Sequence, residues 1–298
     1  MASLMFITFV ITSAVLATSG LISNGFIIIM IAIEWAKSRS LASSDQLFLS
    51  LSLSNIWAIV LLLPFYIDDF LMFSFTGNLV LKILFPIVVF VVISRFWLTA
   101  WLCIFYCIKI VNSTHSCFLW CKRRISWLLP RLLVGSLVFA FFASLSALQI
   151  GPVDLQSNTT GISMMNQGKT LKDSAYAFQI FFFIIGSSSP LLAVVLCSTL
   201  VVASLFRHVC RIISKENFRS LQRGAHIKAA GTVLSLLLLY LSYFVAQTLS
   251  VIADLRKSER FLISLVMMIY SPAQAAILVL NNPKLKQAIT VMIQRRKP

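Results

Sequence analysis

The sequence predicts an all-α membrane protein, a bundle of seven transmembrane helices with its N-terminus outside the cell and a short amphipathic helix at its C-terminus. Two observations predict this fold. The 298 residues are 59% hydrophobic and only 11% charged, with a mean hydropathy of +0.93, which is more apolar surface than a soluble core can hide. Seven apolar stretches are also long enough to cross a bilayer, which takes about 20 residues per helix.

The seven stretches are separated by short polar or charged segments. Backbone groups in lipid must bond within their own segment, so each stretch is expected to be a helix. In chain order, the predicted helices cover residues 4–33, 46–67, 83–108, 125–148, 177–206, 229–253 and 261–280. The first stretch has no basic residue before it and no convincing cleavage site, so we interpret it as a membrane helix and not as a signal peptide. Residues 1–298 are therefore expected to form one seven-transmembrane domain.

The orientation follows from the distribution of Lys and Arg. One set of alternate loops holds 18 basic residues against three acidic ones, whereas the other set holds six of each. Cytoplasmic loops are enriched in Lys and Arg, so the basic side is expected to face the cytoplasm in a multi-pass protein of the plasma membrane. The same asymmetry explains the pI of about 10.0, and nucleic acid is not expected as a partner.

The segment 284–296 is expected to form a membrane-surface helix. It places four apolar residues on one helical face, namely Leu285, Ile289, Met292 and Ile293. An amphipathic helix with basic residues elsewhere lies in the interface of the inner leaflet. We expect it to anchor the chain to membrane lipids.

Two glycosylation sequons test this topology. Asn158-Thr159-Thr160 lies in the longest outside loop, so Asn158 is expected to carry a glycan. Asn112-Ser113-Thr114 lies on the cytoplasmic side and is expected to stay unmodified. All six cysteines fall in helices or on the cytoplasmic side, so no extracellular disulfide is expected.

The sequence gives little support to an enzyme or a transporter. It has no HExxH, GxSxG or Gly-rich phosphate loop, and its three histidines fall on the cytoplasmic side. We expect no catalytic residues, no metal and no cofactor. Transporters usually carry inverted repeats or several intramembrane ionisable residues, whereas this chain has one clear intramembrane charge, Arg95. A small membrane transporter stays open as an alternative.

Local motifs point to a receptor. Trp97, Leu102, Phe105, Tyr106, Lys109 and Ile110 fit a W-x4-L-x2-FYxxKI pattern, and a following FLWxKxRI segment runs from Phe118 to Ile125. Lys284 to Gln287 reads KLKQ. In these motifs, along most of its length, the chain resembles the bitter-taste receptors, the type 2 taste receptor family of G-protein-coupled receptors. Vomeronasal type 1 pheromone receptors, which share this fold, are the alternative to the bitter-taste receptor family.

The resemblance implies a receptor that binds small bitter molecules and signals through a heterotrimeric G protein of the gustducin, inhibitory class. A basic rim on the cytoplasmic face would meet an acidic surface of the G protein. The residues assigned to this coupling are Tyr106, Lys109, Lys122, Arg124, His208, Arg211 and His226. Positive-inside bias explains each of these charges equally well, so the assignment depends on Tyr106 and His208 matching the family.

A ligand pocket is expected in the outward half of the bundle. Helix three presents there Phe85, Val88, Val89, Val92 and Ile93, with no acid to pair with an amine. The resemblance adds residues from helices six and seven, namely Ala246, Gln247, Ser250, Ser264 and Met267. The family often has Trp and Asn where Val88 and Val92 stand, so the pocket is expected to be wide, apolar and suited to uncharged lipophilic compounds. The alternative is that these valines face lipid or core.

The chain departs from the family in its polar core. Asn55 stands where helix two of the family usually carries Arg, and Gln274 stands where helix seven carries His. We hypothesise that the buried guanidinium has moved to Arg95 on helix three and forms a switch. An unpaired Arg in the membrane needs acceptors, and the candidates are Asn24, Asn55, Ser271 and Gln274, with Tyr243 of helix six completing the set. The alternative is that Arg95 only holds helices together.

Overall fold

The computed structural model describes residues 2–71, 78–111, 116–146, 185–204, 206, 220–252 and 256–294. The helices are α1 (Ala2–Ser38), α2 (Ser43–Leu71), α3 (Asn78–Ile110), α4 (Ser116–Ser146), a fifth helix (Ile185–Ser204), α6 (Ser220–Ile252), α7 (Lys257–Asn281) and α8 (Pro283–Gln294). Within these ranges, the seven helices before α8 are long and apolar enough to cross a membrane. The predicted all-α, seven-helix fold class is confirmed.

Most helices extend beyond the apolar stretches from which they were predicted. The 37 residues of α1 span about 55 Å at 1.5 Å per residue, whereas a bilayer core is about 30 Å thick. α4 begins at Ser116 and not at Ile125, because Lys and Arg are good helix formers and continue the helix past the apolar region. The first eight residues predicted for helix five, 177–184, lie outside the described residues.

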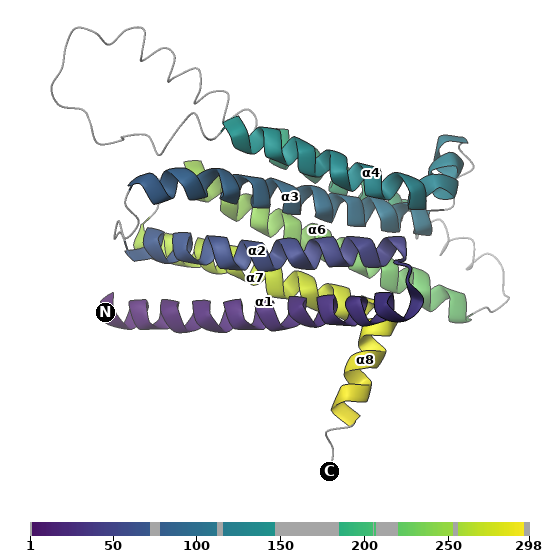
Figure 1. The fold of residues 1–298 in the computed structure, drawn as a ribbon, viewed down its shortest axis with the longest axis horizontal. Helices are drawn as coiled ribbons and strands as arrows, with labels where there is room; N and C mark the ends of the chain where they lie inside the picture. The colour runs from purple at the N-terminus through teal and green to yellow at the C-terminus, as the bar shows by residue number, and fades with distance from the viewer. Residues whose placement is uncertain are drawn as a thin grey trace, which may run out of the picture.

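Two helices occupy the centre of the bundle. α3 packs against α2, α4 and α6, while α7 packs against α1, α2 and α6. The long helices run along a common axis, with the N-terminus at one end of the bundle (Figure 1). α8 leaves the opposite end and runs across that axis (Figure 1). This is the direction of a surface helix if the bundle axis crosses the membrane.

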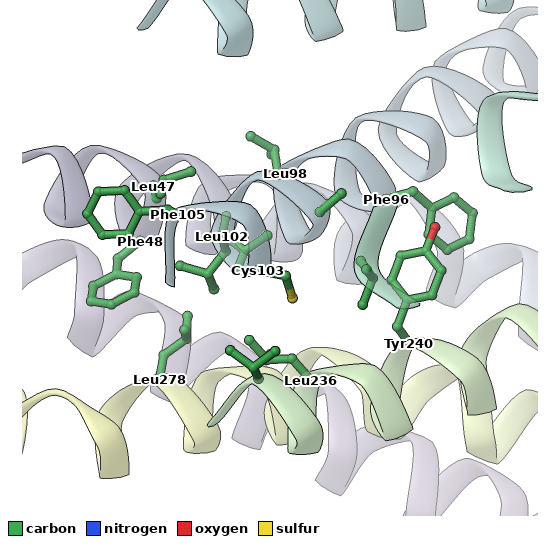
Figure 2. Packing of buried hydrophobic residues seen from close by; sticks show 14 of the residues in the cluster. Leu47, Phe48, Phe96, Leu98, Leu102, Cys103, Phe105, Leu236, Tyr240 and Leu278 are labelled. Carbon is green, nitrogen blue, oxygen red and sulfur yellow. The ribbon is translucent and has the colours of Figure 1, made fainter. Parts of the chain in front are cut away.

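The apolar core lies between α2, α3, α6 and α7. Figure 2 shows Leu47 and Phe48 of α2 at one end of this core and Phe96 of α3 beside Tyr240 of α6 at the other, with Leu236 of α6 between them. Phe96 contacts the Tyr240 ring with a centroid distance of 5.0 Å. The outer faces, in contrast, keep large apolar side chains exposed, which suits contact with lipid.

α8 is tied to the bundle at its first turn. Asn282 caps it, because its Oδ1 accepts the Lys284 backbone N–H at 3.0 Å. The Lys284 ammonium contacts Glu34 of α1 at 3.1 Å. Leu285, which we expected on the lipid-facing side, is only 4% exposed and packs in the bundle core, with Ile289 against the same cluster. The first half of the apolar face of α8 therefore contacts protein.

Candidate functional site

An amide network joins three helices inside the bundle. Asn55 of α2 donates from Nδ2 to Asn24 Oδ1 of α1 at 3.1 Å and to Gln274 Oε1 of α7 at 2.9 Å. Asn24 donates from its own Nδ2 to the Gly20 carbonyl at 2.8 Å and to the Ser271 carbonyl at 3.4 Å. All three amides are fully buried, where an unpaired polar group is costly. The predicted core positions 24, 55, 271 and 274 therefore meet.

The network reaches α3 through Thr99 and Tyr270. Gln274 donates from Nε2 to Thr99 Oγ1 at 3.0 Å and to the Tyr270 hydroxyl at 3.2 Å. The two hydroxyl oxygens lie 3.0 Å apart. Thr99 uses its single hydroxyl hydrogen on the Arg95 carbonyl, at 2.8 Å, so Tyr270 is the donor to Thr99. Interhelical bonds in membranes average about 0.6 kcal/mol each, so the network sets helix register more than it adds stability.

Arg95 lies beside this network without joining it. Its side chain points into the bundle and is 3% exposed. The guanidinium carbon lies 4.5 Å from the centroid of the Tyr270 ring and 4.9 Å from that of Tyr243. Cation–π contacts reach about 2 kcal/mol when desolvated. The charge is therefore stabilised by two aromatic faces, one on α6 and one on α7.

The acceptors that we predicted for Arg95 do not bond to it. Its Nε and Nη2 atoms are buried and have no hydrogen-bond partner among the described residues. Asn24, Asn55 and Gln274 bond to one another, to backbone carbonyls and to Thr99 and Tyr270, while the Asn55 Oδ1 is itself buried without a partner among the described residues. The groups predicted to form a polar cluster therefore converge, but the Nε and Nη2 of Arg95 bond to none of them.

A small cavity of about 20 Å³ opens beside the guanidinium, with room for about one water molecule. It lies between α1, α2, α3 and α7 and is lined by Ala17, Ala58, Ile59, Leu62, Leu63, Tyr66, Arg95, Met267, Met268 and Ser271. Of the ten residues predicted to bind ligand, Met267 alone belongs to this lining. No carboxylate takes part in it.

The predicted pocket wall on α3 divides between two environments. Val89 and Ile93 are buried in a cluster with Ala140 and Ala143 of α4, and Phe85 packs against the same cluster. Val88 and Val92 face the main core instead. These residues were grouped because they lie close together along α3. Their side chains point to different sides of the helix.

The predicted residues on α6 and α7 also differ in exposure. Ala246 and Met267 belong to the main core, and Ser264 is buried. Gln247 is half-buried, and Ser250 is exposed and donates to the Gln247 carbonyl at 2.8 Å. These side chains therefore reach different depths of the bundle.

Sequence reasoning missed three hydroxyl-bearing residues, Tyr66, Thr99 and Tyr270. Thr99 follows Arg95 by one helical turn, and Tyr270 precedes Gln274 by one turn. The i, i+4 spacing puts each on the face of a predicted core residue, which was a usable signal. No comparable signal identified Tyr66, because its place beside Arg95 depends on how α2 and α3 pack.

The predicted coupling residues that the structure describes lie near the ends of α3 and α4, at the end of the bundle that carries α8. Tyr106 is half-buried, while Lys109 is exposed with its Nζ 4.3 Å from the Phe105 ring centroid. Lys122 and Arg124 are exposed on the first turns of α4. His208, Arg211 and the glycosylation site Asn158 lie outside the described residues, as does the side chain of His226.

Seven membrane-length helices around a buried polar network, with a surface helix at one end, define the architecture of a seven-helix membrane receptor. The family model "Taste receptor protein (TAS2R)" matches residues 1–297. Taste receptor type 2 member 1 of Pan paniscus is 33% identical over 276 residues, which cover 90% of this chain and 89% of the relative. Taste receptor type 2 member 40 of Gallus gallus is 30% identical over 281 residues, 92% of this chain and 90% of the relative.

The chain therefore belongs to the type 2 taste receptor family, the bitter-taste receptors among the G-protein-coupled receptors. It is a multi-pass membrane receptor and not an enzyme. Membership in this family implies small-molecule ligands and coupling to a G protein. The match also disfavours the two alternatives considered from sequence, a pheromone receptor and a transporter.

Proposed function

We propose that this receptor resides in the plasma membrane with its N-terminus outside, binds uncharged lipophilic bitter compounds, and signals through a gustducin-type, inhibitory-class G protein. The observation that carries the proposal is the family match across residues 1–297. The proposed ligand site is the outward half of the bundle, and the proposed switch is the polar core around Arg95. The proposed coupling surface is the basic rim that includes Tyr106 and Lys109.

The lining of the core supports the ligand class. The residues proposed for the ligand site are mainly apolar, and none of them is acidic. A cationic amine would therefore lack a counter-charge at this site. Thioether side chains such as Met267 and Met268 adapt to different shapes at small cost, which favours apolar ligands of varied scaffold.

The test is a calcium response in cells that express the chain with a promiscuous G protein carrying a gustducin tail. A panel of diverse bitter compounds is applied, and surface expression is measured alongside. We expect a dose-dependent response that Tyr106→Ala abolishes at equal surface level. Phe142→Ala, which changes an exposed aromatic on α4, serves as the control and should respond normally. Silence across the panel with good expression would contradict the proposed ligand class.

Two further experiments test the class of G protein and the orientation of the receptor in the membrane. Exchanging the gustducin tail for a stimulatory-class tail should remove the response, and an unchanged response would refute inhibitory-class coupling. Asn158→Gln should increase the gel mobility of the receptor by the shift that loss of one glycan causes. Asn112→Gln should leave the mobility unchanged. The reverse pattern would place the N-terminus in the cytoplasm.

A further inference from the structure

The polar side chains that line the cavity beside Arg95 can all donate hydrogen bonds. The guanidinium Nε and Nη2 and the Tyr66 hydroxyl are buried without a hydrogen-bond partner in the described part of the chain. Ser271 contributes a third polar side chain to the lining, and the remaining members are Ala, Ile, Leu and Met. All three polar side chains can donate hydrogen bonds, and one carries a positive charge. A site of this kind favours an acceptor with negative charge.

The aromatic faces leave the positive charge of Arg95 without a counter-ion. Among the described residues, no acidic side chain pairs with it, and its exposure is 3%. Insertion of Arg at the centre of a membrane helix costs about 2.5–3.5 kcal/mol on translocon scales. A water molecule in the cavity would accept hydrogen bonds but would not neutralise the charge. A small anion would do both.

The size of the cavity limits which anion can enter. A space of about 20 Å³ holds about one water molecule, and a chloride ion is only slightly larger. Phosphate, sulfate and carboxylate-bearing organic anions are too large to fit. We propose that the cavity between α1, α2, α3 and α7 is a binding site for a chloride-sized monovalent anion, held by the Arg95 guanidinium with the hydroxyls of Tyr66 and Ser271.

The amide network joins α2, α3 and α7 by neutral hydrogen bonds. An anion at this site would add an ionic interaction between the same helices. Tyr66 belongs to α2, Arg95 to α3 and Ser271 to α7. The ion would stabilise the arrangement of these helices, because a ligand that binds only the folded state adds to its stability. This property is independent of which compound the receptor detects or which G protein it uses.

The test is the thermal stability of the full-length receptor in phosphatidylcholine nanodiscs, followed by the reaction of buried thiols such as Cys103 and Cys107 with a fluorogenic maleimide. Sodium chloride replaces sodium gluconate at constant sodium concentration and ionic strength. We expect a saturable rise in Tm with chloride, which bromide reproduces and sulfate does not. Equal Tm in chloride and gluconate would overturn the proposal and leave water as the occupant.

Three variants connect the effect to the site. Arg95→Met should abolish the response to chloride, while Arg131→Gln, which changes an exposed arginine on α4, should keep it. Ala17→Val narrows the cavity but retains Arg95, and we expect it to raise the half-saturating chloride concentration at least about tenfold, or about 1.4 kcal/mol. An unchanged chloride response in Ala17→Val would overturn the proposal even if Arg95→Met failed to fold.

Discussion

Two arginines on neighbouring helices of this receptor are accommodated in opposite ways. Arg95 of α3 is buried between the rings of Tyr243 and Tyr270, and its Nε and Nη2 lack hydrogen-bond partners among the described residues. Arg131 of α4 is exposed, and its guanidinium carbon lies 3.5 Å from the Trp127 ring centroid. Its Nη1 also donates to the Trp127 carbonyl at 2.8 Å.

The difference shows how position on a helix decides the cost of a charge. Arg131 borders an open groove of about 260 Å³ between α3 and α4, and its side chain bends back toward the start of α4, where water and headgroups can solvate it. Arg95 faces the interior, where solvation must come from aromatic faces or from an occupant of the cavity. We therefore expect Arg131 to be nearly neutral for function and Arg95 to be essential.

The largest expected effect comes from Arg95→Met. Loss of contacts to the rings on α6 and α7, each worth up to about 2 kcal/mol, should weaken ligand-driven signalling by more than about tenfold. Replacing a buried charge by an apolar side chain of similar length is often neutral or stabilising, so Tm in gluconate should not fall. The measurements are the dose–response curve at matched surface level and the Tm.

This variant separates the two interpretations of Arg95. A receptor that signals normally as Arg95→Met but unfolds at lower temperature would show that Arg95 only holds helices together. Arg131→Gln is the matched control, and we expect its dose–response curve to overlay that of the wild type.

The second effect comes from Asn55→Leu in the amide network. It removes both donors from Asn55 and leaves the oxygens of Asn24 and Gln274 without these bonds. An unsatisfied buried group costs about 1–3 kcal/mol, so Tm should fall clearly. Asn281→Leu is the control, because the Asn281 side chain bonds within its own helix, to the Ile277 carbonyl, and to no other helix among the described residues. Equal losses for both variants would contradict a connecting role for the network.

The sequence alone predicted the helices and part of the polar core, but not the surroundings of Arg95. The seven helices followed from apolar length alone, and the convergence of Asn24, Asn55 and Gln274 followed from the need of buried polar groups for partners. The partners of Arg95 did not follow, because they depend on the rotation of α3 relative to α6 and α7. The packing of Val89 and Ile93 against α4 did not follow either, because it depends on the same rotation.

The third effect compares two tyrosines that share contact with Arg95. The Tyr270 hydroxyl is bonded to Thr99 and Gln274, so Tyr270→Phe should cost about 1 kcal/mol. The Tyr243 hydroxyl is buried beside that of Tyr66 without a well-formed hydrogen bond in the described residues, so Tyr243→Phe should cost less than Tyr270→Phe. Both variants keep the ring over the guanidinium. Measuring Tm for the pair distinguishes the hydrogen bond from the cation–π contact, and a larger loss for Tyr243→Phe would contradict this assignment.

The smallest effect is expected outside the membrane core, at the Lys284–Glu34 pair that ties α8 to α1. The hydrogen bond and charge of Glu34 raise the pKa of Lys284. Its contribution to stability is therefore present below the ordinary pKa of lysine and is lost as the pH rises through the raised pKa. Both groups are largely exposed, so Lys284→Met should cost only about 0.2–1 kcal/mol at neutral pH. High salt should reduce this cost, because exposed charges are screened.

Lys286→Met is the control on the same helix, and a double-mutant cycle with Glu34→Gln isolates the pair. A coupling that persists unchanged at high salt would show that packing of Leu285, and not the ion pair, holds α8 in place.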